Sequence, residues 1–473
     1  MKPIKFDISS IRLFRIFFGI YILFEICWTF CLNFKQLFES EEGVWGRFFI
    51  EKYIDAYFPN NLLFYLITTN FQYKLFIGIL ISLVIIYILG YYPKIISLIL
   101  TILLGALYAK YNILLAGWQQ YMLCVLFLSS FIIENSEEQQ AANWYENVLL
   151  FQIGFIYFFN AISKNGASWL NGNAIEQCFR YYPLTTDIGN YLLNFPGFLK
   201  ILTYGSLLFE ISLLFLLLFG YRYYKVRTFT SVCLVLFHLC IQITMEVGHF
   251  YLVVMCVAIL IIPLDSIYTK LINLSNYFSV KRNSPVFTSN KYFHIFISFV
   301  FLYFIIMSNV YQNKQQQCKS EGSDFNETLV SRLYPSNINY VPFFSQYWHF
   351  FAPNPALKTG VIGYIGKKND SSLHLIHNGN EIKYISYEGI NKYLATYIAL
   401  KDYNIKDKLF IQCALVNQFR CWNIKPENYK LISFSMYEFY QTRYIDRQKV
   451  ESLMFDKTVH RSLKLNLDLK YKK

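Results

Sequence analysis

Long apolar runs recur through the first 311 residues, and they constrain the fold more than any other feature. Each approaches the length of about 20 residues that a helix needs to cross a bilayer. We count nine, roughly Ile11–Leu32, Gln72–Leu89, Lys94–Leu115, Trp118–Ile133, Asn147–Ser163, Leu199–Gly220, Thr228–Met245, His249–Leu264 and Tyr292–Tyr311. The mean hydropathy of +0.32 also suits a membrane protein. The pattern predicts a mainly α fold, a polytopic membrane helix bundle of about nine spans, with eight or ten as open alternatives.

The distribution of basic residues predicts the orientation of the bundle. The formal net charge of +13 would suggest a nucleic-acid partner in a soluble protein. Here much of the excess lies in short loops beside the spans, where it sets topology and attracts anionic lipid. We therefore expect membrane lipid and no nucleic acid as a partner. With nine spans the N-terminus is cytoplasmic and the C-terminus extracytoplasmic, in a bacterial inner membrane or a eukaryotic endomembrane.

The composition changes from about Gln312 onward, where charged residues replace the apolar runs. Asn391–Asp402 has the pattern of a helix. Short alternating stretches predict strands at Gly360–Gly366, Leu373–His377, Ile382–Tyr387 and Leu431–Tyr440. We expect two domains: a transmembrane bundle over residues 1–311, and a small soluble extracytoplasmic α+β domain with a basic tail over residues 312–473.

Ionisable side chains within the spans are the first candidates for function, because charge in a bilayer is costly and usually faces the bundle interior. Those near helix ends are interpreted as side chains that extend toward the interface. They are Arg15, Lys110 and Glu246. Glu25, Glu210 and His238 lie nearer mid-helix, and His249 begins the next span. For these residues a structural ion pair or hydrogen bond and a functional site are both open.

Lys164 stands where an apolar span gives way to polar, Gly-rich sequence, five residues before Trp169. Spacing alone favours an interfacial anchor. The alternative is a functional base, since an amine held out of bulk water can stay neutral and accept a proton. Metal chemistry is not predicted: His238 and His249 lie eleven positions apart without a carboxylate at metal-site spacing, and there is no CxxC pair.

Several segments together resemble the horizontally transferred transmembrane (HTTM) family, which includes vitamin K-dependent γ-glutamyl carboxylase. The resemblance is strongest in Tyr157-Phe-Phe-Asn-Ala-Ile-Ser-Lys164-Asn-Gly-Ala-Ser-Trp169-Leu-Asn-Gly172. The other segments are Arg15-Ile-Phe-Phe-Gly19, Leu202-Thr-Tyr-Gly-Ser-Leu-Leu-Phe-Glu210, Phe237-His238, Val247-Gly-His-Phe250, Gln346-Tyr-Trp-His-Phe-Phe-Ala-Pro-Asn-Pro355 and Cys421-Trp-Asn423.

The resemblance implies that Lys164 deprotonates reduced vitamin K or another quinol, after which oxygen adds and an epoxide forms. Tyr157 and Trp169 would then wall the quinone site, with Glu210, His238 and His249 as further polar groups. The family's catalytic histidine corresponds to Tyr121 in Trp118-Gln-Gln-Tyr121, and a tyrosine is a poor proton acceptor at neutral pH. Quinol oxidation or epoxidation is thus easier to support than carboxylation of a protein or peptide substrate.

Two further functions remain open on the sequence. One is a non-catalytic quinone- or lipid-binding membrane protein, or an accessory subunit of a membrane complex. The other is a transporter, which the lack of an inverted repeat or of paired Gly/Pro-broken helices disfavours.

Overall fold

A computed structural model describes the chain over residues 6–32, 69–110, 117–132, 144–180, 185–220, 223–245, 247–264, 291–321, 329–333, 359–368, 373–377, 380–381, 429–439 and 462–469. The helices are α1 (Ile8–Ile26), η1 (Cys27–Leu32), α5 (Asn70–Ile88), α6 (Pro93–Lys110), α7 (Gly117–Ser129), α8 (Trp144–Ser163), α9 (Ala167–Leu170), α10 (Ala174–Phe179), α11 (Asp187–Leu192), α12 (Pro196–Gly220), α13 (Tyr224–Thr244), α14 (Phe250–Ile261), α17 (Lys291–Glu321) and α18 (Leu329–Leu333).

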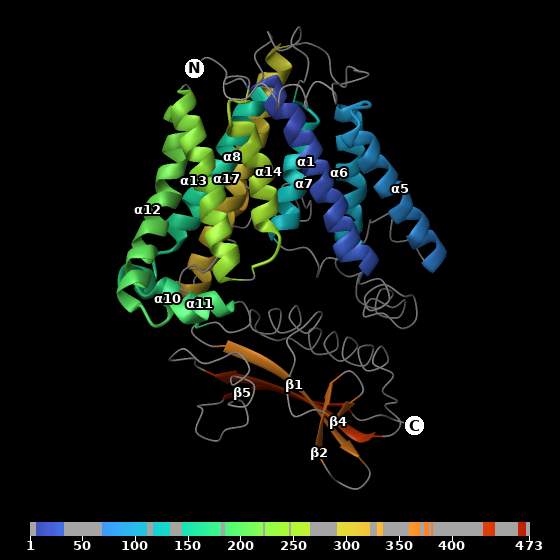
Figure 1. The fold of residues 1–473 in the computed structure, drawn as a ribbon, viewed down its shortest axis with the longest axis vertical. Helices are drawn as coiled ribbons and strands as arrows, with labels where there is room; N and C mark the ends of the chain where they lie inside the picture. Colours follow the sequence, from blue (N-terminus) through green and yellow to red (C-terminus); the bar gives the residue numbers. More distant parts are fainter. Residues whose placement is uncertain are drawn as a thin grey trace.

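The long helices run side by side as a bundle (Figure 1), and within the described residues each predicted span overlaps one of them. Among the residues that the structure describes, four helices are long and apolar enough to cross a membrane by themselves, namely Ile8–Cys31, Asn70–Ile88, Pro196–Leu218 and Tyr224–Thr244. The apolar stretches of α6, α8, α14 and α17 are shorter, and α7 has 13 residues. The chain is thus an integral membrane protein, while nine crossings stay a prediction.

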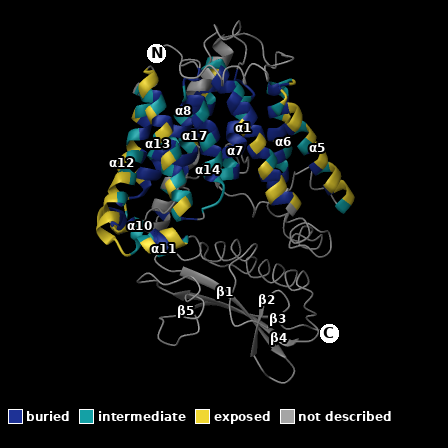
Figure 2. Cartoon of the chain, viewed as in Figure 1, coloured by how far each residue is buried: buried dark blue, intermediate teal, exposed yellow. Residues whose placement is uncertain are grey.

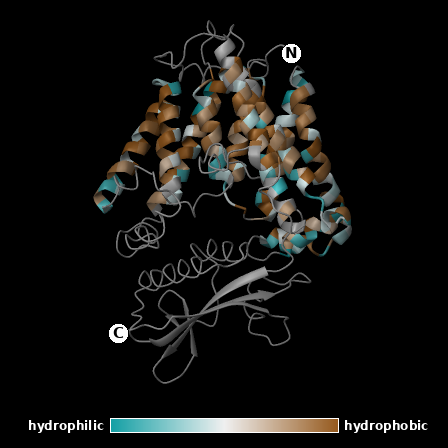
Figure 3. Ribbon diagram, turned by 180° about the vertical axis from the view of Figure 1, so that it is seen from behind, coloured by the Kyte–Doolittle hydropathy of each residue, from teal (hydrophilic) through white to brown (hydrophobic). Residues whose placement is uncertain are grey.

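The bundle is apolar both inside and outside. Figure 2 shows buried residues filling the space between the helices, with exposed positions along the outer faces of α5, α12 and α13. Figure 3 shows that hydrophobic residues predominate along the long helices. Leu75, Ile201 and Leu208 on these faces are each more than half exposed. Large exposed apolar side chains fit a surface that contacts lipid, which is as apolar as they are.

Local sequence sets the limits of α5 and α6. Thr69 caps α5 in a capping box with Gln72, and the chain turns through Gly90 at φ +80° before Pro93 opens α6. Arg15 of α1 donates from Nη1 to the carbonyl oxygens of Tyr87 (2.8 Å) and Ile88 (2.5 Å). The expectation that Arg15 extends to the interface is wrong. Its side chain is buried because the last carbonyls of α5, which lack helical partners, accept its hydrogen bonds.

The chain between α8 and α12 folds into three short helices, α9 to α11, at one end of the bundle (Figure 1). We call the described residues of this stretch, 164–180 and 185–195, the cap. The structure holds it against two long helices, α12 and α13. Thr186 Oγ1 donates to the carbonyl of Ile243 on α13. Thr185 also forms an isolated antiparallel bridge with Met245, just after α13.

Five strands follow the helices in the described C-terminal residues: β1 (Thr359–Lys368), β2 (Leu373–His377), β3 (Asn380–Glu381), β4 (Tyr429–Phe439) and β5 (Ser462–Leu469). They form one antiparallel sheet in the order β3-β2-β1-β4-β5. β1, β2 and β4 coincide with predicted strands, and β5 was not predicted.

Some predictions fall outside the residues that the structure describes. They are the strand Ile382–Tyr387, the helix Asn391–Asp402 and the motifs at 346–355 and 421–423. α17 continues to Glu321, ten residues beyond the expected domain boundary.

Candidate functional site

Lys164 is the first residue after α8, and the cap covers it. Its backbone N–H donates to the carbonyl of Ala161, which ends the helix. The chain then turns through Asn165 and Gly166 into α9. The side chain of Lys164 is only 4% exposed. An interfacial anchor would keep its ammonium group in water or among lipid headgroups, so the anchor interpretation does not fit this geometry.

Glu210, on the facing helix α12, is the partner of Lys164. The Nζ atom of Lys164 lies 2.6 Å from Oε1 and 2.8 Å from Oε2 of Glu210, whose side chain is also 4% exposed. Asn160, one turn earlier on α8, donates from Nδ2 to Glu210 Oε1 at 3.1 Å. Taking two charges out of water is costly, and the pair survives because each charge neutralises the other at hydrogen-bond distance.

Asn160 has a second polar atom that the structure leaves without a partner. Its Oδ1 is buried and accepts no hydrogen bond within the described part of the chain. An unpaired buried acceptor costs roughly 1–3 kcal/mol. Because Nδ2 of the same amide contacts Glu210, this free acceptor lies beside the Lys164–Glu210 pair. A bound molecule with a hydroxyl group would satisfy it.

Trp169 closes the other side of Lys164. Its ring centroid lies 4.4 Å from Nζ, a cation–π contact. The turn after α9 depends on Gly172, whose φ of +79° suits glycine. A Cβ atom there would lie 2.7 Å from Cγ of Lys200 on α12. Tyr204 of α12 donates to the carbonyl of Leu170 at 2.9 Å and fixes the same turn. The Asn-Gly sequence thus brings Trp169 over the amine.

A tyrosine–histidine pair lies deeper in the bundle. Tyr157 of α8 and His238 of α13 form a short side-chain hydrogen bond, and both are buried. Phe237 and Phe250 pack around the imidazole at 5.4 and 5.2 Å between ring centroids. Phe250 also packs against Tyr121 of α7, at 5.7 Å between ring centroids, and Asn160, one turn after Tyr157 on α8, bonds to Glu210. Tyr157, His238, Tyr121 and the Lys164–Glu210 pair therefore form one buried polar region, which we call the Lys164 cluster.

Cys178 of α10 borders this cluster from the cap. The thiol is buried. Burial raises the pKa of Cys178 to about 12, and the nearby charge of Lys164 acts in the opposite direction. The thiol is therefore protonated at neutral pH and is not a nucleophile there.

His249 belongs to a second group, not to the Lys164 cluster. Its Nδ1 lies 2.9 Å from Oε2 of Glu25 on α1. The other oxygen of Glu25 accepts hydrogen bonds from four further side chains. These are Thr29 (3.0 Å), Tyr108 (3.4 Å), Trp118 (3.4 Å) and Gln119 (2.8 Å). We call this set, with His249, the Glu25 cluster.

Sequence reasoning found the charged members of both clusters and missed their amide partners. Lys164, Trp169 and Glu210 meet as a unit, and Tyr157 meets His238. Nothing in the residue pattern pairs Glu25 with His249, which are 224 residues apart. Asn160 and Gln119 were not singled out, although an amide inside an apolar helix needs a partner.

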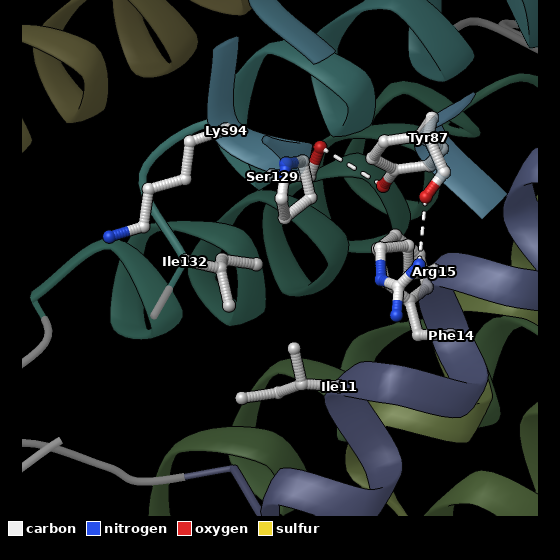
Figure 4. Close-up of a pocket in the computed structure, with 8 residues that line it drawn as sticks. Ile11, Phe14, Arg15, Tyr87, Lys94, Ser129 and Ile132 are labelled. Carbon is white, nitrogen blue, oxygen red and sulfur yellow. Dashed lines mark hydrogen bonds between the residues drawn. The ribbon is translucent and has the colours of Figure 1, made fainter. Parts of the chain in front are cut away.

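The cavity in Figure 4 lies away from both clusters, between the N-terminal part of α1 and the α5–α6 turn. Arg15, Tyr87, Lys94 and Ser129 contribute its polar groups. Its volume of about 10 Å³ is room for about one water molecule. The cavity is therefore too small for a quinone.

Comparison with known families gives one match. A family model described as the HTTM domain matches residues 4–265, which is more than half of the 473 residues. The match runs from before α1 to just after α14 and contains every residue of the two clusters. No curated protein and no solved structure matches the chain.

Proposed function

The chain belongs to the HTTM domain family, and on that premise we propose that it is a vitamin K-dependent carboxylase-like membrane protein that oxidises a quinol, with Lys164 as the base. The observation that carries the proposal is the buried Lys164–Glu210 pair with the free acceptor Oδ1 of Asn160 beside it. The substrate would be reduced vitamin K or another quinol carried in the bilayer, and oxygen would be the co-substrate.

The pair offers a way to make a lysine act as a base inside the bundle. If the proton of the Lys164 ammonium moves to Glu210, the amine becomes neutral and its lone pair can accept a proton. The total charge of the pair is zero before and after this transfer, so no net charge is created in a low-dielectric interior. Glu210 would therefore store the proton that Lys164 must lose before it can act.

The groups around the pair fit a quinol hydroxyl. Asn160 Oδ1 would accept a hydrogen bond from the hydroxyl and orient it toward Nζ. Trp169, 4.4 Å from Nζ, would keep bulk water from the amine. The Tyr157–His238 pair would line the deeper side of the site. When bound, the quinol supplies the reaction with oxygen, and the protein supplies proton transfer, orientation and exclusion of water.

The experiment is quinol turnover by the purified protein in detergent or nanodiscs. Reduced vitamin K or menaquinol is added with oxygen, and the epoxide is sought by mass spectrometry. We expect product from the wild type and from Lys225→Ala, which removes an exposed lysine at the start of α13. Lys164→Ala and Glu210→Gln should yield none, and Asn160→Ala should mainly raise KM. Unchanged turnover by folded Lys164→Ala would refute the assignment.

A non-catalytic role is the second candidate, and one observation favours it. By the sequence resemblance, Tyr121 stands where vitamin K-dependent γ-glutamyl carboxylase has a histidine, so proton transfer in the carboxylation step lacks its usual acceptor. In this alternative the protein binds a quinone or lipid or serves in a membrane complex with Lys164 as a structural charge. It predicts quinone binding without turnover, and stable co-purifying partners.

The topology belongs to the same proposal. We propose nine membrane crossings with the N-terminus in the cytoplasm, which places the cap and the C-terminal α+β domain on the extracytoplasmic side. The positions of lysine and arginine in short loops support it, as does the overlap of each predicted span with a helix.

A further inference from the structure

The Glu25 cluster has the construction of a binding site and takes no part in the proposed chemistry at Lys164. Glu25 of α1 is 1% exposed and, within the described part of the chain, accepts hydrogen bonds from five side chains of η1, α6, α7 and the α13–α14 turn. Both of its oxygens are therefore engaged. The open position in the cluster is on His249.

One ring nitrogen of His249 is engaged and the other is available. Nδ1 bonds to Glu25, which fixes the ring orientation. No hydrogen bond to Nε2 is formed by any residue that the structure describes. The side chain of His249 is 18% exposed, unlike that of the buried His238. A carboxylate on Nδ1 favours the tautomer in which Nε2 is a hydrogen-bond acceptor.

Aromatic rings surround this imidazole on the outer side of the bundle. The ring centroids of Phe24 and Trp28 lie 4.9 and 5.7 Å from that of His249. Phe24 and Trp28 stack on each other at 5.9 Å and are 39% and 45% exposed. Trp118 packs on the inner side at 6.3 Å. A ligand from the bilayer would therefore approach Nε2 of His249 past the rings of Phe24 and Trp28, on the lipid-facing surface of α1 and η1.

The backbone is shaped to hold this arrangement. Gly248 has φ +88°, and a Cβ atom there would lie 2.7 Å from the Trp118 ring. Glycine therefore lets the turn after α13 bring His249 against Trp118. Cys27–Leu32 forms a π-helical turn, which places Trp28 beside His249 and Thr29 on Glu25. π-Helical turns inside helices are frequent at functional sites.

We propose that the Glu25 cluster is a binding site for a phenol dissolved in the bilayer. The hydroxyl of the phenol would donate to His249 Nε2, and its ring would pack against Phe24 and Trp28. Aromatic side chains favour a flat ring, and one acceptor nitrogen at the edge of an apolar entrance selects a ligand with one polar edge. This site does not depend on turnover at Lys164.

The test compares two ligands that differ in the proposed hydrogen bond. A photoreactive alkyl phenol and its methyl ether are titrated against the protein in nanodiscs, and cross-linked residues are located by mass spectrometry. We expect the phenol to bind about three- to tenfold tighter than the ether, as one hydrogen bond provides, with the label on residues 24–29. Equal binding of both ligands, or a label on α8 or α12 instead, would overturn the proposal.

Variants separate the hydrogen bond from the ring contact. His249→Phe should abolish the preference for the phenol over its methyl ether. Phe24→Leu should lower the affinity for both ligands alike. Phe17→Leu is the matched control, because Phe17 lies two helical turns earlier on α1 and is 47% exposed; it should change neither. Lys164→Ala should also leave binding intact, so failure of the quinol proposal would not affect this result. A preference that persists in folded His249→Phe would count against His249.

Discussion

At the scale of residues, Lys164 and Glu210 depend on each other. Each is a charge removed from water, and each is tolerated because the other lies within 3 Å. Removing one partner of such a pair leaves the other charge buried and uncompensated, which typically costs about 3–5 kcal/mol. Replacing both by apolar residues of similar size can be neutral or stabilising.

This dependence predicts a strongly non-additive double-mutant cycle. Lys164→Met and Glu210→Leu should each lower the free energy of unfolding by about 3–5 kcal/mol, and the double variant should recover most of the loss. Denaturant unfolding in detergent measures the free energy of unfolding of the wild type, the two single variants and the double variant. If the single changes cost less than about 1 kcal/mol, as for an exposed pair, the two residues are not a buried ion pair.

Cys178 gives a pH-dependent prediction. Its pKa of about 12 in the folded protein lies above the usual value for a thiol, because burial disfavours the thiolate. The stability from this burial is present below about pH 8.5, and it is lost as the pH rises toward 12, because the unfolded chain ionises first. At pH 8 maleimide should spare the buried Cys178 until the protein is unfolded. Rapid native labelling of Cys178 would mean that the cap opens readily.

The residue scale also shows how far sequence reasoning reaches. The ionisable residues Glu25, Glu210 and His238 were identified because they lie in apolar spans, where an ionisable group is costly unless it has a polar partner. The apolar pattern did not identify their partners. Lys164 and Glu210 are 46 residues apart on different helices, and the helical period places a side chain on a face without saying which helix covers that face.

At the scale of elements, the Lys164 site depends on the close approach of α8 and α12. Gly154 of α8 allows it, since a Cβ atom there would lie 2.6 Å from Cδ1 and 3.3 Å from the Cα atom of Leu214. The second contact is with backbone, which cannot rotate away. Small residues at helix contacts let membrane helices approach closely.

Enlarging Gly154 should therefore damage the site from a distance. We expect Gly154→Val to separate α8 from α12, lower the melting temperature and reduce quinol turnover at least tenfold. Gly205→Val on α12 is the control, because nothing lies within 4 Å of a Cβ atom there. Equal losses in both variants would trace the effect to helix propensity rather than to helix contact.

The apolar runs predicted the positions of the long helices well, because about 20 apolar residues in a row have few other ways to satisfy their backbone in lipid. They did not predict α9 to α11 in the cap. Those helices have 4 to 6 residues, too few for a periodic pattern, and they are held by contacts such as Tyr204 with Leu170 that sequence does not reveal.

At the scale of the whole molecule, the cap connects the Lys164 cluster to the end of α13. Gly172 and Tyr204 tie it to α12 beside Lys164, and Thr185 and Thr186 tie it to the end of α13, shortly before His249. The resemblance to the HTTM family, which the family model confirms, assigns these segments to one family domain. Family membership does not reveal which of the segments contact one another.

The proposed topology predicts that the cap and the start of α13 face opposite sides of the membrane. Leu170→Cys in the cap and Tyr223→Cys before α13 introduce thiols at exposed positions, 68% and 66% exposed. A membrane-impermeant maleimide added outside intact cells should label the first and not the second, with wild type as the background. Labelling of both from the same side would contradict the nine-span arrangement.

The central claim is that Lys164 serves as a base because its amine is paired with Glu210 at this particular position. The most direct test is quinol turnover by the exchanged variant Lys164→Glu/Glu210→Lys, compared with wild type. The exchange keeps a neutral buried pair, so the variant should fold, and it moves the amine to α12. The account predicts a folded protein with no epoxide product. Wild-type turnover by the exchanged protein would contradict it.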